Sequence, residues 1–373
     1  MKAWPVLGVT LMQLLLFSAH WFIYRTWIAF WYPLGPSAAL ALRSATLVLA
    51  FSFIVAALLS FRFSNFLVAA AYKIAAVWLG FLNYFFWASC VGWLACLALR
   101  FSPLAPELPR CRPLIVGMLF ALATLACLYG LLNARWIRIR RIPVKLPHLP
   151  ASWRGRKALV LSDLHLGNIN GRAFSRRIVS MVHRLAPDIV FIPGDLFDGT
   201  KADLDRLIEP FRQLSPPFGI YFVTGNHEEF GRAEPYIEAV TRAGIRVLAN
   251  EQVVADGLVI AGIPHRDSTY PIRVRAALEA LRLDPAQASI LLNHEPTRLP
   301  IAEQAGLGLQ LSGHTHGGQI FPFTWLTRRV FGKFTHGLHR FGALQVYTST
   351  GAGTWGPPMR VGTHSEIALL QFE

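Results

Sequence analysis

Five short polar clusters in the second half of the chain combine residue types that bind metal ions. They read Asp163-Leu-His165, Gly194-Asp195-Leu-Phe-Asp198, Gly225-Asn226-His227-Glu228, Asn293-His294-Glu295 and Gly313-His314-Thr-His316. Imidazole nitrogens and carboxylate oxygens bind Mn, Fe and Zn, and this half of the chain contains no cysteine. In two-metal hydrolytic sites the ions lie about 3.5–4 Å apart. A carboxylate must lie between such ions because they repel each other. We therefore expect two divalent metal ions.

The elements that must position these clusters form an alternating pattern. Each cluster follows a short apolar run that is typical of a buried strand, over residues 158–161, 189–192, 220–223, 289–292 and 307–311. Helical stretches at 173–185, 203–213, 234–243 and 273–281 alternate with them, which predicts α/β layers. Ligands of an open α/β sheet bind outside the carboxyl ends of its strands, so the clusters should converge there. The last expected strands, 344–348 and 366–372, would close a second sheet.

The order and content of the five clusters resemble the calcineurin-like metallophosphoesterases. That family pattern is D-x-H, G-D-x-x-D, G-N-H-[ED], a later His and G-H-x-H, and the resemblance covers roughly residues 156–373. It implies a two-sheet sandwich flanked by helices. It also implies a bridging carboxylate from Asp195 and a bridging hydroxide as nucleophile. The first metal would take Asp163, His165, Asp195 and His316, and the second Asp195, Asn226, His294 and His314.

Two further residues receive catalytic roles from the same resemblance. His227 matches the family histidine that is not a ligand and that protonates the leaving oxygen or stabilises the phosphoryl charge. Glu228 is expected to orient His227, as a carboxylate fixes an imidazole tautomer. Asp198 is interpreted as a helix N-cap or a support of the site rather than a ligand. The histidines outside the clusters, His183, His265 and His336, are interpreted as non-ligands.

Within the family, the later motifs resemble the membrane-associated bacterial branch. These motifs are His314-Thr-His316-Gly-Gly-Gln319, the stretch 347–354 and Pro358-Met-Arg360. That branch includes enzymes that cleave phosphodiester or pyrophosphate bonds, among them pyrophosphatases of UDP-diacylglucosamine. The tail Gly362-Thr-His-Ser-Glu366 departs from the Arg-Pro-Glu usual in that branch, which leaves the substrate open.

The first third of the chain has a different composition. Residues 1–133 hold one acidic and eight basic residues, a net charge of +7, and nearly all the rest is apolar or small. A membrane-spanning helix needs about 20 apolar residues, and the stretches 4–24, 44–61, 74–99 and 114–133 approach that length. We therefore expect a region of about four transmembrane helices at 1–133. A basic, proline-containing linker at 134–155 and a metallophosphoesterase domain at 156–373 would follow.

The basic segment after the last apolar stretch suggests an orientation. The positive-inside rule places residues 134–157 in the cytoplasm, although Arg100, Arg110 and Arg112 would then lie outside. We expect a multi-pass protein of the inner membrane with a cytoplasmic catalytic domain. The four cysteines all fall in the membrane region and match no metal or redox motif.

The charge of the chain suggests a partner. Of the net charge of +15, the remaining +8 belongs to residues 134–373 and lies partly beside a membrane span. Anionic lipid explains it better than nucleic acid. Basic and aromatic residues alternate between Phe321 and Phe341, either as a surface loop or as a lip that touches the bilayer. Arg172, Arg176 and Arg177 form a helix face or bind substrate phosphates.

These features together predict a membrane-anchored, metal-dependent phosphoesterase for a phosphodiester or pyrophosphate, with a lipid-linked substrate. The alternatives are a tethered nucleotide or nucleic-acid phosphodiesterase and a non-catalytic membrane scaffold. The sequence names no protein partner and does not identify the metal.

Overall fold

A computed structural model describes residues 3–31 and 34–373, which divide into two compact units. The first comprises Met1–Leu132 together with Gly356–Met359, and the second comprises Asn133–Trp355 together with Arg360–Glu373. The boundary between them lies close to the expected end of the membrane region. Each unit has a core of its own.

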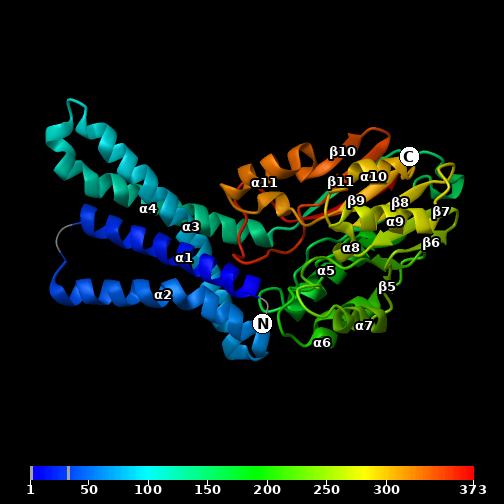
Figure 1. Cartoon of the computed structure of the whole chain (residues 1–373), viewed down its shortest axis with the longest axis horizontal. Coiled ribbons are helices and arrows are strands. Elements are labelled where there is room, and N and C mark those ends of the chain that lie inside the picture. The colour runs from blue at the N-terminus through cyan, green and yellow to red at the C-terminus, as the bar shows by residue number, and fades with distance from the viewer. Residues whose placement is uncertain (1–2, 32–33) are drawn as a thin grey trace. The chain divides into compact units, whose positions relative to one another are not determined.

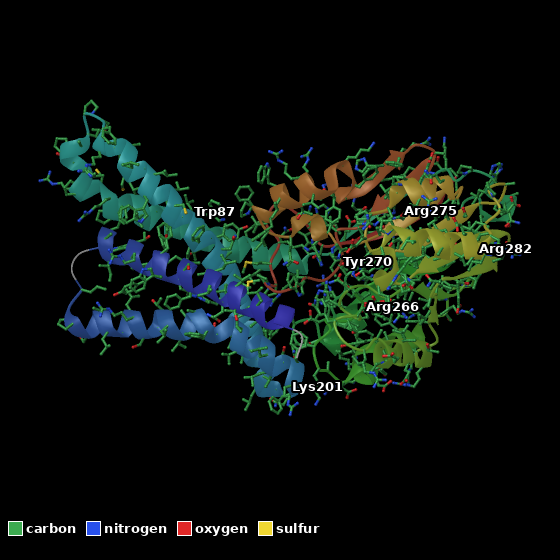
Figure 2. The ribbon with its side chains drawn as sticks, viewed as in Figure 1. Trp87, Lys201, Arg266, Tyr270, Arg275 and Arg282 are labelled. Carbon is green, nitrogen blue, oxygen red and sulfur yellow. The ribbon has the colours of Figure 1, made fainter. Side chains whose placement is uncertain are left out.

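The first unit consists of long apolar helices. They are α1 (Ala3–Phe30), α2 (Pro36–Arg62), α3 (Phe66–Arg100) and α4 (Leu108–Arg135), with the short η1 (Ala105–Glu107) before α4. In the ranges that the structure covers, all four α-helices are long and apolar enough to cross a membrane. Their outward side chains are largely apolar, such as Trp87 on α3 (Figure 2). The expectation of about four spanning helices is therefore confirmed at the level of length and composition.

Polar side chains inside this helical unit pair with one another. The indole Nε1 of Trp78 on α3 donates to Nε2 of His20 on α1 at 2.8 Å, and Nε1 of Trp93 donates to the Thr26 hydroxyl at 3.0 Å. Both bonds join α3 to α1, as expected where a bilayer offers no water to satisfy a donor. Glycine also permits close packing in this unit, because Gly80 lies so close to Met359 that a Cβ on Gly80 would overlap the Met359 side chain.

The second unit contains two six-stranded mixed sheets (Figure 1). The first has the order β1 (Arg138–Val144), β12 (Glu366–Phe372), β2 (Lys157–Val160), β3 (Ile189–Ile192), β4 (Ile220–Phe222) and β5 (Arg246–Val247). The second has the order β10 (Gly337–Phe341), β11 (Leu344–Thr348), β9 (Leu309–Ser312), β8 (Ser289–Asn293), β7 (Leu258–Ile263) and β6 (Glu251–Ala255). The run β2–β5 is parallel, and so is the run β7–β8–β9–β11.

Helices cover the outer faces of the two sheets. The first sheet carries α5 (Arg172–Leu185), α6 (Leu204–Ile208), η3 (Glu209–Gln213) and α7 (Glu234–Arg242). The second carries α9 (Pro271–Leu281) and α10 (Leu299–Gln304), and the short α8 (His265–Ser268) precedes α9. Ile178 of α5 packs with Val190 of β3, and Leu278 of α9 packs with Leu291 of β8. A third core lies between the sheets and includes Phe191 and Ile290. The predicted two-sheet sandwich flanked by helices is therefore confirmed.

The last strand lies in a different sheet from the one expected. Glu366–Phe372 (β12) belongs to the first sheet, where it is parallel to β1 and antiparallel to β2, and only Leu344–Thr348 (β11) joins the second sheet. The pattern of apolar residues marks a strand but does not specify its neighbours, because pairing over such a distance depends on the whole fold.

The segment 134–155, expected to be a linker, contributes regular structure to the second unit. Arg138–Val144 forms β1, which pairs with β12 along its whole length, and Ala151–Trp153 forms η2. Trp153 is fully buried, and its indole donates to the carbonyls of Ala255 and Asp256 at 3.0 and 3.1 Å. The second unit thus begins at the end of α4 rather than at residue 156.

Candidate metal centre

The five polar clusters converge at the carboxyl ends of β2, β3, β4, β8 and β9. Three groups of side chains have ligand atoms within 4.8 Å of one another: Asp163, His165 and His316; His165, Asp195 and His227; and Asp195, His294 and His314. All seven residues that the sequence offers as ligands lie in or directly beside these groups. Asp195 belongs to two of them, as a bridging carboxylate would.

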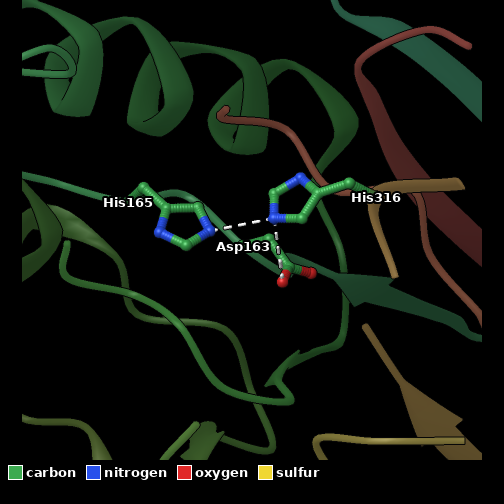
Figure 3. Close-up of side chains that lie close together, drawn as sticks. All are labelled: Asp163, His165 and His316. Carbon is green, nitrogen blue, oxygen red and sulfur yellow. Dashed lines mark hydrogen bonds and ion pairs between the residues drawn. The ribbon is translucent and has the colours of Figure 1, made fainter. Parts of the chain in front are cut away.

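The first ligand group surrounds two facing imidazoles (Figure 3). Nε2 of His165 lies 3.0 Å from Nε2 of His316, and Nε2 of His316 lies 3.6 Å from a carboxylate oxygen of Asp163. Oδ2 of Asp195 lies 3.8 Å from Nε2 of His165. All four side chains are buried. Two imidazole nitrogens and two carboxylates therefore point at one small volume.

The second ligand group centres on His294. Its Nε2 lies 3.2 Å from Oδ2 of Asp195 and 3.1 Å from Oδ1 of Asn226. The same amide oxygen lies 2.9 Å from Nδ1 of His314. This arrangement brings two imidazoles, one carboxylate and one amide oxygen together.

The backbone at these residues is unusual. Asp163, His165, Asp195, His314 and His316 have φ angles of 52°, 48°, 50°, 68° and 49°. Left-handed φ values are uncommon for residues other than glycine, and such conformations cluster at functional sites. Five of the seven candidate ligands are held this way, so the surrounding structure fixes their directions at a local conformational cost.

Two glycines allow the ligand loops to approach one another. A Cβ on Gly225 would overlap the carboxylate of Asp195, and a Cβ on Gly313 would overlap Ser162 and the carboxylate of Asp163. The loops are also joined through the backbone, because His314 N–H donates to Oδ1 of Asp163 at 2.9 Å. The motif glycines therefore serve close packing around the carboxylates.

The donor set fits divalent metal ions. Nδ1 of His294 donates to the carbonyl of Pro193 at 2.8 Å, which turns Nε2 toward Asp195 and Asn226. Burial lowers the pKa of His294, but Asp195 outweighs this effect and raises the pKa to about 10. For Asp195, burial raises the pKa, but His294 and the other nearby histidines hold it well below its usual range. The cluster thus favours a positive charge beside Asp195, which a bound cation supplies.

His227 lies beside the first group, and its ring is fixed by a backbone carbonyl. Its Nδ1 donates to the carbonyl of Asp198 at 2.9 Å, and its ring centroid lies 4.5 Å from that of His165. Nε2 of His227 lies 4.0 Å from Oδ2 of Asp195, so it faces the space between the ligands. Burial lowers the pKa of His227, against the opposing influence of Asp195.

The expected role of Glu228 as the partner of His227 is wrong. The Glu228 carboxylate instead accepts hydrogen bonds from the backbone N–H groups of Asp195, Phe197 and Gly225 at 3.1, 2.8 and 2.8 Å. It therefore joins the β3 and β4 loops and acts on the site through Asp195. Burial, followed by the charge of Asp195, raises the pKa of Glu228 to about 8. Sequence adjacency to His227 suggested the wrong partner because successive residues of this turn point in different directions.

Asp198 supports the first group. Oδ1 of Asp198 lies 3.7 Å from Nδ1 of His165. The side chain is buried, and burial raises its pKa well above the usual range. This position matches the interpretation of Asp198 as a support of the site.

Two residues beside the second group were not singled out from the sequence as part of the site. His265 follows β7, and its ring lies 5.8 Å from that of His294. Glu295 places one carboxylate oxygen 3.6 Å from Nε2 of His314 and 3.7 Å from Nδ1 of His265. Their position in the sequence could have indicated that they belong to the site, because each follows a strand whose carboxyl end faces it.

Arg360 is a third residue whose role the sequence did not indicate. Its side chain is fully buried, and it donates to the carbonyls of His316, Thr350 and Gly353 at 3.1, 2.6 and 2.7 Å. One guanidinium nitrogen also lies 3.2 Å from Nδ1 of His316. Arg360 therefore holds the His316 turn against the glycine-rich loop that follows β11.

One arginine after the first cluster has a structural partner, and a second lines a cavity away from the ligands. Arg172 forms an ion pair with Glu209 at 2.8 Å, across α5 and η3. Arg176 lines a cavity of about 340 Å³ between the same elements, and no ligand residue lines that cavity. His183, which was interpreted as a non-ligand, hydrogen-bonds to the carbonyl of Gln213.

Aromatic side chains that are exposed or partly exposed border the ligand groups. The ring of Phe230 lies 4.3 Å and that of Trp355 5.7 Å from the His227 ring, and both side chains are about half exposed. On the other side, the Phe331 ring lies 6.2 Å from that of His314. An apolar rim of this kind suits a substrate that carries an apolar group.

Comparison with known proteins agrees with these features. The family model for calcineurin-like phosphoesterases matches residues 156–318. A transmembrane protein with a metallophosphoesterase domain from Danio rerio is 35% identical over 258 residues, covering 65% of this chain and 59% of that protein. An uncharacterized metallophosphoesterase of Aquifex aeolicus is 31% identical over 257 residues, covering 68% of this chain and 98% of that protein.

A third relative matches over a stretch of similar length. It is an uncharacterized metallophosphoesterase of Campylobacter jejuni, 32% identical over 242 residues, covering 63% of each chain. The matched region thus spans less than two thirds of the Danio rerio and Campylobacter jejuni proteins.

Proposed function

Because the chain belongs to the calcineurin-like phosphoesterase family, we propose that it is a membrane-anchored, metal-dependent hydrolase of phosphodiester or pyrophosphate bonds. The observation that carries this proposal is the position of Asp195, whose carboxylate lies in contact range of both ligand groups. A single metal site would not require a carboxylate between two sets of imidazoles.

Two divalent ions, Mn, Fe or Zn, would be held by these groups. One ion would be bound by Asp163, His165 and His316. The other ion would be bound by Asn226, His294 and His314. Asp195 would bind both ions. Ions bound in this way supply Lewis acidity toward phosphoryl oxygens and lower the pKa of water. The chain itself would contribute buried, preoriented ligands and a nearby proton carrier.

His227 is the residue proposed to act directly on the substrate. Its Nδ1 is engaged by the carbonyl of Asp198, so Nε2 is the atom available to the substrate. A proton on Nε2 could pass to the leaving oxygen, or the ring could stabilise phosphoryl charge. Glu228 would not contact the substrate. Its carboxylate would act indirectly, by holding the backbone of Asp195 in place.

A lipid-linked substrate is proposed on two grounds. The first is the apolar rim formed by Phe230, Trp355 and Phe331 beside the ligands. The second is the presence of four helices of membrane-spanning length, more anchoring than a soluble substrate requires. The Danio rerio relative, itself named as a transmembrane protein, is consistent with a membrane setting.

For location we propose the inner membrane, with the catalytic unit in the cytoplasm. The basic residues from Arg135 to Arg141, directly after the last apolar helix, support this orientation through the positive-inside rule. The first alternative, a tethered nucleotide or nucleic-acid phosphodiesterase, differs from the proposed enzyme in its substrate. The second alternative, a non-catalytic scaffold, differs from it in having no hydrolytic activity.

The test uses the full chain in detergent with a chromogenic phosphodiester. We expect hydrolysis with Mn²⁺, loss of hydrolysis with a chelator, and recovery when Mn²⁺ is returned. Asp195→Asn should abolish activity and lower the bound metal measured by elemental analysis, because it removes the shared carboxylate. Asp284→Asn, an exposed residue after α9, is the matched control and should behave as wild type. Equal activity of Asp195→Asn and wild type would rule out the two-metal hydrolase.

A further inference from the structure

Helix α11 (Phe323–Phe331) is largely exposed although much of its surface is apolar. It follows the His316 turn, and none of its residues is buried. Phe323, Leu326 and Val330 expose 49%, 51% and 68% of their surface. The spacing i, i+3 and i+7 puts these three side chains on one stripe of the helix. An exposed apolar stripe of this kind normally packs against another apolar surface.

The helix is held to the catalytic unit by its other side and by its ends. Thr324, Thr327 and Phe331 are less exposed than the stripe. At the amino end, a Cβ on Gly318 would overlap the backbone of Thr324. At the carboxyl end, the hydroxyl of Thr315 donates to the carbonyl of Thr335 at 2.6 Å. The exposed stripe is therefore presented by a fixed element that begins beside a metal ligand.

Cationic groups lie along this helix and directly after it. Arg328 and Arg329 lie on the exposed part of the helix, and Lys333 follows it. The guanidinium of Arg329 lies 5.0 Å from the Trp325 ring centroid, and the Lys333 ammonium lies 5.2 Å from that of Phe334. The sequence from Phe321 to Phe341 contains no acidic residue. Apolar, aromatic and cationic side chains on one short helix are characteristic of helices that lie in the membrane interface.

We propose that α11 is an interfacial helix that inserts Phe323, Leu326 and Val330 into the headgroup region of an anionic bilayer. Arg329, three residues after Leu326 on the helix, and Lys333 would pair with lipid phosphates, and Trp325 would lie at the interface. The chain passes from α4 to β1 through only Trp136 and Ile137, so connectivity keeps the second unit close to the bilayer. The partner is thus present wherever the helices of the first unit are inserted.

This binding would place the metal centre at the membrane surface. The Phe331 ring at the end of α11 lies 6.2 Å from that of the candidate ligand His314. A headgroup bound beside α11 would therefore be near the ligand groups. Contact between α11 and lipid does not require hydrolysis, so it can be measured whether or not the proposed activity is present.

The experiment compares two labelled positions in the full chain. Cys90, Cys96, Cys111 and Cys127 are replaced by Ala, and a single cysteine is introduced by Leu326→Cys or by Val254→Cys. Val254 is the matched control because it is an apolar side chain, 64% exposed, on β6 at the opposite edge of the second sheet from β10. Each cysteine carries an environment-sensitive NBD fluorophore, and the protein is placed in nanodiscs of phosphatidylcholine and phosphatidylglycerol.

Lipids with a nitroxide near the headgroup provide the main readout. We expect the label at position 326 to emit at shorter wavelength, to lose most of its fluorescence to the nitroxide lipids and to resist iodide. The label at position 254 should show the opposite behaviour. Adding Arg329→Gln and Lys333→Gln should reduce the lipid quenching at position 326, and so should nanodiscs of phosphatidylcholine alone.

Three outcomes would overturn the inference. Equal quenching at positions 326 and 254 would show general proximity to lipid rather than a docked helix. Exposure of position 326 to iodide without lipid quenching would show that α11 stays in water. A short-wavelength emission without lipid quenching would show that protein covers α11, either from this chain or from a second copy.

Discussion

The chemistry of the metal centre depends on which nitrogen each imidazole presents. A neutral histidine has one donor nitrogen and one acceptor nitrogen, and its hydrogen-bond partner selects between them. The carbonyl of Pro193 takes Nδ1–H of His294, and the carbonyl of Asp198 takes Nδ1–H of His227. Both rings therefore direct Nε2 toward Asp195. The two residues differ in distance, because Nε2 of His294 lies 3.2 Å and that of His227 lies 4.0 Å from Oδ2 of Asp195.

That difference underlies a prediction for His227→Ala. If His227 carries a proton or stabilises charge, the variant should lose about 10²–10⁴-fold in turnover, the usual range for general acid–base catalysis. Its metal content should stay at the wild-type level, because the candidate ligands are unchanged. Turnover with Mn²⁺ and elemental analysis test the two statements. His183→Ala on α5 is the control, and loss of metal from the His227 variant would identify His227 as a ligand.

Among the secondary-structure elements, β12 connects the two halves of the sandwich to the site. It is hydrogen-bonded between β1 and β2 in the first sheet. Its first residue, Glu366, accepts a hydrogen bond from the hydroxyl of Tyr347 on β11 in the second sheet at 2.6 Å. Glu366 also accepts from the Thr350 N–H at 3.1 Å, at the base of the loop held by Arg360. One buried carboxylate thus ties both sheets to that loop.

This carboxylate predicts a pH-dependent contribution to stability. Burial raises the pKa of Glu366, but hydrogen bonds from His364, Tyr347 and Thr350 outweigh it and leave the pKa below its usual value. A folded-state pKa below the unfolded one means that the ionised group stabilises the fold. That contribution is fully present above the unfolded pKa of about 4.3 and is lost as the pH falls through the folded value.

We therefore expect Glu366→Gln to lower the apparent Tm at pH 7. The expected loss in the free energy of unfolding is about 1.5–3 kcal/mol, the usual contribution of a hydrogen bond to a charged group. The difference from wild type should shrink as the pH is lowered below about 4. Thermal unfolding followed by intrinsic fluorescence at several pH values measures both effects. The exposed substitution Glu279→Gln on α9 serves as the control. A difference that grows on acidification would contradict the assignment of a lowered pKa.

At the scale of the whole molecule, the chain joins four apolar helices to a two-sheet sandwich of the calcineurin-like phosphoesterase family. If the substrate is lipid-linked, the enzyme meets it in two dimensions, and the surface concentration of the lipid governs the rate. Soluble nucleotides would not respond to the membrane surface. A nucleic-acid substrate would show a rate that falls steeply with salt, because binding to phosphates releases counterions.

The corresponding prediction concerns surface dilution. With the full chain in mixed micelles, we expect hydrolysis of a lipid-linked pyrophosphate to fall when detergent is added at constant bulk lipid. Hydrolysis of a soluble chromogenic diester by the same sample should stay constant and reports on enzyme integrity. A preference for linear or cyclic nucleotides at every dilution, with no dependence on the surface, would exclude the lipid substrate.

The sequence by itself determined the features that depend on short stretches of chain. Apolar runs of strand length identified β2, β3, β4 and β8 to within about one residue at each end, because burial on both faces requires continuous apolar side chains. Long apolar stretches identified four helices of spanning length. The ordered polar clusters identified the family, which the comparisons confirm. They also nominated the seven side chains that the structure brings together.

Tertiary structure alone decided the features that join distant segments. The pairing of β12 with β1 and β2 links residues far apart in sequence, and a run of apolar residues does not encode its neighbours. The partner of His227 proved to be the carbonyl of Asp198, because backbone carbonyls leave no mark in the sequence. The role of Arg360 follows from burial beside His316, which only the packed loops create. Left-handed φ angles at the candidate ligands likewise arise because the assembled loops fix each backbone against its local preference.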